Sequence, residues 1–486
     1  MKKILRKTKQ LTRKFYKRYK ALLQCCDPLL LSMISNYGLF DSKWYLETNS
    51  DVREAKRDPL YHYISSGWLE GRIPFASYSE KLYLQMAPDY IPSLSSPLVD
   101  MARRVANGTL SQENLALLKS LDNSTIPHDH HRLYNGITIC GFLCSEIGLG
   151  QAARNLAYSA DIARVNVDFY NLSVPGRDND TEFATKCGSR IYTEKALFVL
   201  PLDANALQLL KKAPGRHLIL YPYWELARIP DSCIKFLDLC DEFWAPSSFI
   251  KEMFSSFSKP STLIPQPVKI PSESDFLSSC VNPDIFTVLT YFDIDSYQAR
   301  KNPMASVKAF QAAFPSDRDV KLIVKLRGSN SKQEIRNKLK RAARYDERIT
   351  IIDKTITRYE IEQLVMCCNV FISLQRSEGF GFGPAEALAA AKPVITTCYG
   401  GVTDFINSHT AYPVSFNLVS VKQEEYPEWE GQVWADPIID DAVESLRFIK
   451  NNPNIAAARG RAGREWMINH HSVEAVGELI KTKLSN

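Results

Sequence analysis

The chain has 486 residues, a length that favours several domains over a single core. Hydrophobic residues make up 45% and charged residues 23%, which is ordinary for a globular protein and excludes disordered, collagen-like and disulfide-scaffold classes. No apolar run reaches the roughly eighteen residues of a membrane-spanning helix, and the N-terminus lacks the apolar stretch of a secretory signal. The eleven cysteines lie mostly in apolar runs without a CxxC pair, which predicts reduced thiols and a cytoplasmic location.

The positive net charge is concentrated at the N-terminus. Residues 1–20 contain ten Lys or Arg and no acid, so a net charge of +6 becomes −4 once they are removed. Apolar residues recur among them at helical spacing, which predicts a basic amphipathic tail over residues 1–29. Such a helix suits an anionic membrane surface, contacted through residues 1–23, and would make the protein peripheral on the inner face of the plasma membrane. A solvated tail and a helix that docks on a protein partner are the alternatives; nothing indicates nucleic-acid binding.

Residues 30–121 predict a small helical module with a degenerate 38-residue repeat, in which Tyr45 matches Tyr83 and Pro59 matches Pro97. The module is rich in aromatic residues. Core packing is the simpler interpretation of these side chains, and carbohydrate stacking is the alternative. A polar, histidine-rich stretch at residues 122–135 predicts a linker.

From residue 136 onward, strand-length apolar runs such as GITICGFL alternate with segments of helical period. This alternation is typical of parallel α/β structure. It restarts after PQPVKIPSESD, so we expect two Rossmann-like doubly wound domains, residues 136–270 and 271–486, facing a cleft.

The segment SLQRSEGFGFGPAEALAAAKPVITT, residues 373–397, is the most informative part of the chain. An apolar strand leads into a loop with three glycines, and we expect a helix to begin at Pro384. A loop of this kind exposes backbone N–H groups beside a helix N-terminus, which is where a phosphate binds. With Gly383 as the N-cap, Glu386 falls at the third helical position and suits the helix dipole, while Glu378 reads equally well as a surface charge.

Together, the two glutamates and the loop EGFGFGPAE form an E-x7-E pattern that resembles the signature of retaining family 4 glycosyltransferases. These enzymes have the GT-B fold, and their bacterial polysaccharide-synthesis branch often carries an N-terminal helical module. Segments similar to EIGLGQAARNL, PYWEL and VWADP occur in that branch. The resemblance implies that Glu386 binds the nucleotide ribose and that Glu378 lies near the donor sugar. It also implies that the loop between them faces the sugar and diphosphate, at Phe380, Gly381, Phe382 and Gly383.

A departing diphosphate gains negative charge, and fixed cations stabilise it. Arg300 and Lys301 follow the apolar run FTVLTYF, and Lys325 ends the run VKLIVK, so all three are candidates, with surface solvation as the alternative. Many family members have an Arg five positions before the loop lysine, where this chain has Ser296. Either Arg300 substitutes for that residue, or Lys301 and Lys325 hold the phosphate.

Two further candidates lie in the first α/β domain. Gly150 starts a helix after a strand, and the resemblance brings it toward the diphosphate and acceptor. Read alone, GLGQAA also fits a dinucleotide fingerprint, but four residues, CSEI, separate it from the strand. The resemblance sets Glu225, after the run LILYPYW, on the acceptor side; a structural carboxylate is the alternative reading for it and for Asp203.

The implied reaction transfers a hexose, with retained configuration, from a nucleotide-diphosphate sugar to a growing surface polysaccharide, such as an O-antigen or capsule, or to a lipid-linked glycan. GDP-mannose is the first choice of donor. We expect no metal and no cofactor beyond this substrate. A non-catalytic GT-B-like scaffold subunit of a polysaccharide assembly complex and, less favoured, a dinucleotide-binding oxidoreductase are the alternatives.

Overall fold

The structure is a computed structural model that describes residues 27–68, 72–78, 83, 86–87, 90, 96–120, 134–174, 181–188, 191–272, 281–328 and 333–485. Residues 1–26 of the expected basic tail and residues 122–133 of the expected linker lie outside this description. The chain divides into two compact units. The first comprises the residues up to Tyr134 together with Asp168–Tyr192, and the second comprises Asn135–Val167 together with the chain from Thr193 onward.

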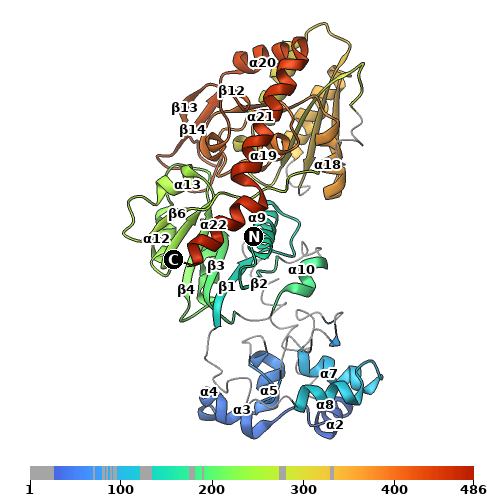
Figure 1. The fold of residues 1–486 in the computed structure, drawn as a ribbon, viewed down its shortest axis with the longest axis vertical. Helices are drawn as coiled ribbons and strands as arrows, with labels where there is room; N and C mark the ends of the chain where they lie inside the picture. Colours follow the sequence, from blue (N-terminus) through green and yellow to red (C-terminus); the bar gives the residue numbers. More distant parts are fainter. Residues whose placement is uncertain are drawn as a thin grey trace. The chain divides into compact units, whose positions relative to one another are not determined.

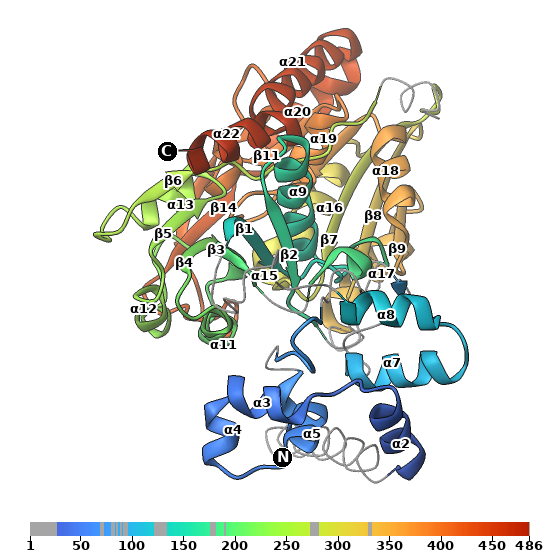
Figure 2. The same cartoon turned by 60° about the horizontal axis from the view of Figure 1, so that its bottom comes forward.

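The described residues between 27 and 120 form a helical body around an aromatic core, in which Tyr45, Tyr63 and Tyr83 are fully buried. The Tyr45 hydroxyl is hydrogen-bonded to His62 Nδ1 at 3.0 Å. Helices α2 and α7 pack against each other (Figure 2). The helices are α2 (Pro28–Asn36), α3 (Ser42–Thr48), α4 (Ser50–Glu54), α5 (Pro59–His62), the π-helix η1 (Tyr63–Gly67), α7 (Pro97–Ala106) and α8 (Gln112–Ser120).

The 38-residue repeat of the sequence has a structural counterpart. Pro59 and Pro97, which match in the repeat, each begin a helix behind an N-cap side chain, Asp58 or Ser96, that accepts a backbone hydrogen bond. Proline suits the first helical position because its missing N–H needs no partner there. The matched tyrosines of the two copies are both in the core, so packing explains them.

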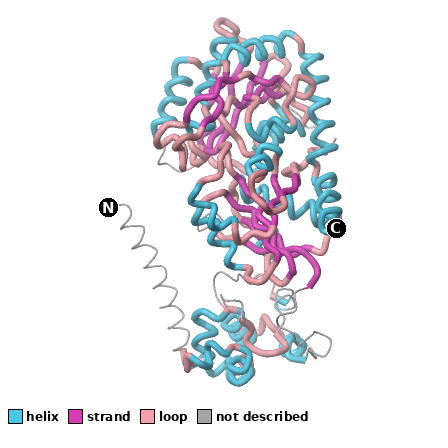
Figure 3. Tube along the Cα trace, turned by 90° about the vertical axis from the view of Figure 1, so that its left-hand side faces the viewer, coloured by secondary structure: helices cyan, strands magenta, loops and turns pink. Residues whose placement is uncertain are grey.

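The α/β part contains two six-stranded sheets, visible as two groups of strands in Figure 3. The first has the order β2-β1-β3-β4-β5-β6 and the second β12-β11-β10-β7-β8-β9. Neighbours β3–β4, β7–β8 and β7–β10 are parallel. The expected pair of Rossmann-like folds is therefore confirmed. The strands are β1 (Tyr134–Gly141), β2 (Val167–Asn171), β3 (Thr193–Pro201), β4 (His217–Tyr223), β5 (Glu242–Ala245), β6 (Ser261–Leu263), β7 (Phe286–Asp293), β8 (Val320–Arg327), β9 (Ile349–Asp353), β10 (Val370–Ser373), β11 (Val394–Thr397) and β12 (Tyr412–Val414).

We call the parts of the second unit built on these two sheets its first half and its second half. The C-terminal helix α22 (Val473–Ser485) packs against α9 (Gly148–Ile162) of the first half, and α21 (Pro453–His471) packs against α19 (Phe382–Ala389) (Figure 1). The chain thus returns to its first half at the end. An antiparallel pair, β13 (Phe416–Ser420) and β14 (Val433–Pro437), adds to the second half.

The remaining helices follow the strands in alternation, as the sequence predicts. They are α10 (Thr181–Lys186), α11 (Ala204–Leu207), η2 (Gln208–Lys212), α12 (Asp231–Leu237), α13 (Ser248–Met253), α15 (Gln298–Lys301), α16 (Pro303–Ala313), α17 (Gln333–Tyr345), α18 (Arg358–Cys367), η3 (Gly400–Asp404) and α20 (Ile439–Asn451).

The expectation of reduced thiols is wrong at one residue, because Cys367 is disulfide-bonded. Free thiols occur at Cys140, Cys144, Cys187, Cys233, Cys240, Cys368 and Cys398.

Within the described residues, no helix has both the length and the apolar character needed to cross a bilayer.

Candidate active site

The candidate site lies where the strand order of the second sheet reverses. Strands β7 and β10 are neighbours there, and the chain leaves them in opposite directions across the sheet. Parallel α/β sheets bind their ligands at the carboxyl ends of the strands at such a switch point. The loop after β7 carries Arg300 and Lys301, and the loop after β10 carries Glu378.

A one-turn helix, α15, holds the two cations. It is bracketed by two non-glycine residues with positive φ, Tyr297 at 62° and Asn302 at 44°. Such conformations cost about 1 kcal/mol or more and persist only where surrounding contacts impose them. Arg376, in the loop after β10, supplies two contacts: its N–H donates to the Arg300 carbonyl at 2.8 Å, and its Nη1 donates to the Ala299 carbonyl at 2.9 Å.

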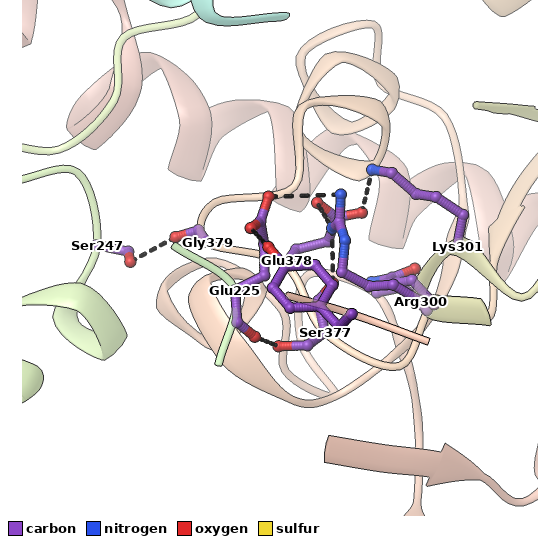
Figure 4. A network of polar contacts seen from close by, with 10 residues as sticks. Glu225, Ser247, Arg300, Lys301, Ser377, Glu378 and Gly379 are labelled. Atoms are coloured by element: carbon purple, nitrogen blue, oxygen red, sulfur yellow. Dashed lines mark hydrogen bonds and ion pairs between the residues drawn. The ribbon is translucent and has the colours of Figure 1, made fainter. Parts of the chain in front are cut away.

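Glu378 is the carboxylate on which both cations converge (Figure 4). It accepts from Arg300 Nη1 at 2.9 Å and pairs with Lys301 Nζ. Burial on its own raises the pKa of Glu378, but Lys301 and Arg300 outweigh it, so the pKa lies below the ordinary value. Burial also lowers the pKa of Lys301, against the opposing effect of Glu378. Glu378 is therefore ionised, as a carboxylate, at neutral pH.

Arg300 is committed to protein partners in both halves. It donates to the Ser377 carbonyl at 2.9 Å, and its Nη2 lies 3.4 Å from Glu225 Oε1. Burial opposes its charge, but Glu225 and Glu378 outweigh burial and raise the pKa of Arg300. Its side chain is 3% exposed, against 20% for Lys301. Lys301 is therefore the more available of the two cations for an incoming anion.

Glu225 follows β4 in the first half and takes part in the same network. It accepts a hydrogen bond from Tyr426, in the segment between β13 and β14, and its backbone carbonyl accepts from Ser377 Oγ. Trp224 packs edge-on against Tyr426, with ring centroids 5.2 Å apart. Sequence reasoning missed Tyr426, because the segment KQEEYPEWE in which it lies carries no recognisable motif.

The glycine-rich loop also contacts the first half directly. Ser247 Oγ, at the start of α13, donates to the Gly379 carbonyl at 2.7 Å (Figure 4). A Cβ on Gly379 would come within 2.7 Å of the Trp224 carbonyl. Glycine at this position therefore permits the close approach of the two halves.

Helix α19 begins two residues earlier than expected, at Phe382, with Gly381 as its N-cap. Gly381 has a φ of 98°, and a Cβ there would lie 2.4 Å from Val402 Cγ1. The assignment of Gly383 as N-cap is therefore wrong, and Pro384 takes the third helical position, where its missing N–H still needs no partner. Glu386 falls two residues further in than expected, at the fifth position, so helix capping does not explain it.

The two loop phenylalanines differ in their surroundings. Phe380 is buried, and its ring packs against Phe405 and His471 at centroid distances of 5.4 and 5.6 Å. Phe382 is partly buried beside it. Phe380 can therefore face a ligand only through its backbone.

Glu386 has its own pair of partners. Its Oε1 lies 2.7 Å from Arg358 Nη1, and its Oε2 accepts from the Tyr291 hydroxyl. Tyr291 lies on β7 and Arg358 begins α18. The sequence reasoning missed both residues. The Thr357–Glu360 capping box signals the start of α18, but a capping pattern says nothing of where the next side chain points.

Among the residues that the structure describes, Lys325 makes no ion pair with Glu378, the carboxylate that Lys301 contacts. It lies on β8, paired in register with Tyr291, and is 3% exposed. Burial lowers its pKa, with Arg327 acting in the same sense, while Asp293 and Asp353 oppose them. Within the described part of the chain, no hydrogen bond or ion pair reaches its ammonium group.

Gly150 is the third residue of α9, and a Cβ there would come within 2.1 Å of the Ser145 carbonyl. The same turn is tied to the second half, because Arg327 donates to the Glu146 carbonyl. Asp203 caps α11 by accepting from two backbone N–H groups, which is the structural role. Across the described ranges, no group of three His, Cys, Asp or Glu side chains is arranged to hold a metal.

Comparison with known proteins agrees with this fold. Residues 291–466 match the family model "Glycosyl transferases group 1". A comparison with curated proteins gives no match. Anabaena HepE, solved in complex with UDP and glucose, is 12% identical and aligns over 72% of this chain and 100% of its own, with a TM-score of 0.54. Sucrose-phosphate synthase from Thermosynechococcus elongatus is 13% identical over 72% of this chain and 98% of its own, with a TM-score of 0.52. The expected GT-B fold class is confirmed.

Proposed function

We propose that the protein is a retaining glycosyltransferase of family 4 that moves a hexose from a nucleotide-diphosphate sugar to a glycan hydroxyl. The observation that carries the proposal is the convergence of Arg300 and Lys301 on Glu378 at the sheet's switch point. All three residues lie inside the segment that matches the glycosyl transferase family model.

Lys301 is assigned to the leaving diphosphate. Its ammonium has three donors, of which the contact with Glu378 uses one, so a phosphate oxygen can be bound without breaking that pair. A fixed cation beside the departing phosphate stabilises the charge that develops as the glycosidic bond breaks. Arg300 supports this indirectly by holding Glu378 and α15 in place.

Glu378 is assigned to a hydroxyl of the donor sugar. Its lowered pKa makes it an acceptor of hydrogen bonds rather than an acid, so it does not suit the proton-donating role of a glycosidase carboxyl. With two cations already on it, it is also a weak nucleophile. Same-face attack, in which the leaving phosphate takes the acceptor's proton, fits these residues better than a covalent glycosyl-enzyme.

Glu225 is assigned to the acceptor side. Its carboxylate accepts from Tyr426 and pairs with Arg300, which leaves acceptor capacity for a glycan hydroxyl. The acceptor we propose is a surface polysaccharide, such as an O-antigen or capsule, or a lipid-linked glycan. A basic N-terminal tail on the cytoplasmic face of the membrane suits such an acceptor.

The donor base is open to direct test. GDP-mannose remains our first choice, and the complexes of Anabaena HepE with UDP and with UDP-glucose make UDP-sugars the competing choice. A thermal-shift panel of GDP-mannose, UDP-glucose and dTDP-glucose on the full chain identifies the class, because a ligand that binds only the folded state raises the melting temperature.

Release of the nucleoside diphosphate from the selected donor then separates an enzyme from a scaffold subunit. We expect release in the presence of glycan acceptors, and loss of release in Lys301→Ala. A melting temperature unchanged by all three donors, together with no release, would overturn the proposal in favour of the scaffold.

A further inference from the structure

Both oxygens of the Glu386 carboxylate are engaged by protein donors. Arg358 Nη1 lies 2.7 Å from Oε1, and the Tyr291 hydroxyl donates to Oε2. The Glu386 side chain is 10% exposed, whereas that of Arg358 is 40% exposed. The carboxylate is thus held from one side by a buried strand and from the other by a residue at the surface.

Arg358 and Tyr291 both act as hydrogen-bond donors to Glu386, and neither can act as the acceptor. Arginine has donors only. Burial raises the pKa of Tyr291, and Glu386 raises it further, so the phenol keeps its proton and acts as the donor. A carboxylate has about four acceptor positions, so these two contacts leave about two free. Two acceptor positions on one fixed carboxylate match two hydroxyl hydrogens of a vicinal diol.

The orientation of Arg358 is set by its own surroundings. It is the first residue of α18, directly after the capping box of Thr357 and Glu360. Its Nε donates to Glu362 Oε1 at 3.0 Å while Nη1 contacts Glu386, so the guanidinium spans two carboxylates. Glu386 and Glu362 both raise the pKa of Arg358 against the effect of burial. A planar guanidinium can hold two carboxylates in a fixed geometry, which an ammonium cannot.

We infer that Arg358 is a positioning residue for the donor nucleotide: it orients Glu386 so that the two free acceptor positions receive the 2′- and 3′-hydroxyls of a ribose. The inference rests on the proposed function and on the ribose contact that the resemblance implies for Glu386; its new element is the role of Arg358. Deoxyribose lacks one of the two hydroxyls and leaves one acceptor position without its partner. Donors built on dTDP therefore bind more weakly than those built on GDP or UDP.

The test compares ribose with deoxyribose on the full chain. The probes are UDP and 2′-deoxy-UDP, and GDP and 2′-deoxy-GDP, with dissociation constants measured by calorimetry. In the unmodified protein we expect the ribonucleotide of the bound pair to be preferred by about tenfold or more, the effect of one hydrogen bond to a charged group. In Arg358→Gln the preference falls toward one, and in Arg358→Lys it is intermediate.

Two further variants make the result specific. Glu362→Gln removes the charge of the other partner of Arg358 but keeps an oxygen that accepts from Nε, so Arg358 stays oriented and the preference for ribose is kept. Tyr291→Phe removes the second donor to Glu386 and shows whether a fixed carboxylate sets the preference. Where Arg358→Gln folds poorly, Arg358→Lys, which keeps the charge but not the planar guanidinium, tests the positioning role of Arg358. A loss of stability alone would weaken both nucleotides of a pair equally and leave their ratio unchanged.

The outcomes separate this inference from the proposed function. If the unmodified protein binds none of the four nucleotides but dTDP-glucose raises its melting temperature, the proposed function stands and the inference fails. If no donor of any class binds, both fail. If it binds a ribonucleotide and Arg358→Gln keeps the full preference, the proposed function stands and the positioning role of Arg358 is overturned. With donor sugar as substrate, the role predicts a raised KM at nearly constant kcat in Arg358→Gln.

Discussion

Arg300 and Glu225 lie in different halves of the α/β unit, and Arg300 Nη2 approaches Glu225 Oε1 to 3.4 Å. The same guanidinium contacts Glu378, so one buried cation connects a carboxylate on the acceptor side with a carboxylate on the donor side. Removing one partner from such a group leaves a buried charge without compensation, which costs about 3–5 kcal/mol. The two adjacent cations of this chain therefore differ: Arg300 supports the architecture, and Lys301 is available for chemistry.

The first prediction is that Lys301→Ala lowers turnover by about 10²–10³-fold, the usual effect of removing one group that stabilises transition-state charge. Sugar transfer measured as nucleoside diphosphate release checks it. Lys308→Ala is the matched control, because Lys308 is exposed on the adjoining helix α16 and makes no contact with Glu378. Unchanged turnover in Lys301→Ala would remove the basis for assigning this residue to the diphosphate.

The second prediction concerns Glu378 and stability. Glu378→Gln leaves Arg300 and Lys301 buried with less compensation, and we expect a loss of about 3–5 kcal/mol in the free energy of unfolding. Because the folded-state pKa of Glu378 is below the ordinary value of 4.5, its contribution is present above that value and is lost as the pH falls through the folded pKa.

Urea unfolding of the wild type and Glu378→Gln at neutral pH and at successively lower pH measures this directly. The difference between the two proteins is constant around neutrality and shrinks below about pH 4.5. A difference that stays the same into the acid range would mean that the carboxylate is not stabilised by its two cations.

The sequence predicted the α/β alternation and the importance of residues 378–386 because strand-length apolar runs and glycine spacing are local signals. The sequence reasoning misplaced the start of α19 because Gly381, Gly383 and Pro384 all satisfy the local rules for a helix start. The close approach of Val402 to Gly381 is a tertiary contact that no local rule contains. Side chains that come together from distant segments could not be paired from local sequence patterns. Tyr426 is 201 positions from Glu225, and Tyr291 is 95 positions from Glu386.

A third prediction distinguishes the two glycines that begin α9. Gly150→Ala forces a Cβ to within 2.1 Å of the Ser145 backbone carbonyl, so we expect a loss of about 1–3 kcal/mol in the free energy of unfolding. Gly148→Ala adds a methyl group where no atom lies within 4 Å, and alanine is the better helix former, so it is neutral or slightly stabilising. Urea denaturation of both variants decides the point, and equal losses would contradict the tight first turn.

The last prediction concerns the acid sensitivity of the packing behind the glycine-rich loop. His471 is 2% exposed, its ring packs against Phe380, and its Nδ1–H donates to the Gln266 carbonyl at 3.1 Å. Burial lowers the pKa of His471 to about 4, from an ordinary value of 6.5. Between these values the unfolded chain binds a proton that the folded chain does not, so the free energy of unfolding falls as the pH is lowered.

The total loss from this residue is about 3 kcal/mol, at about 1.4 kcal/mol per pH unit. His471→Gln removes the titration, so its stability falls less than that of the wild type between about pH 6.5 and pH 4, and the two proteins converge. His470→Gln, at the exposed neighbouring position, retains most of the wild-type dependence, because burial lowers the pKa of His471 more than His470 does. Urea unfolding across this range is the measurement, and parallel curves for the wild type and His471→Gln would show that the histidine is not held neutral against Phe380.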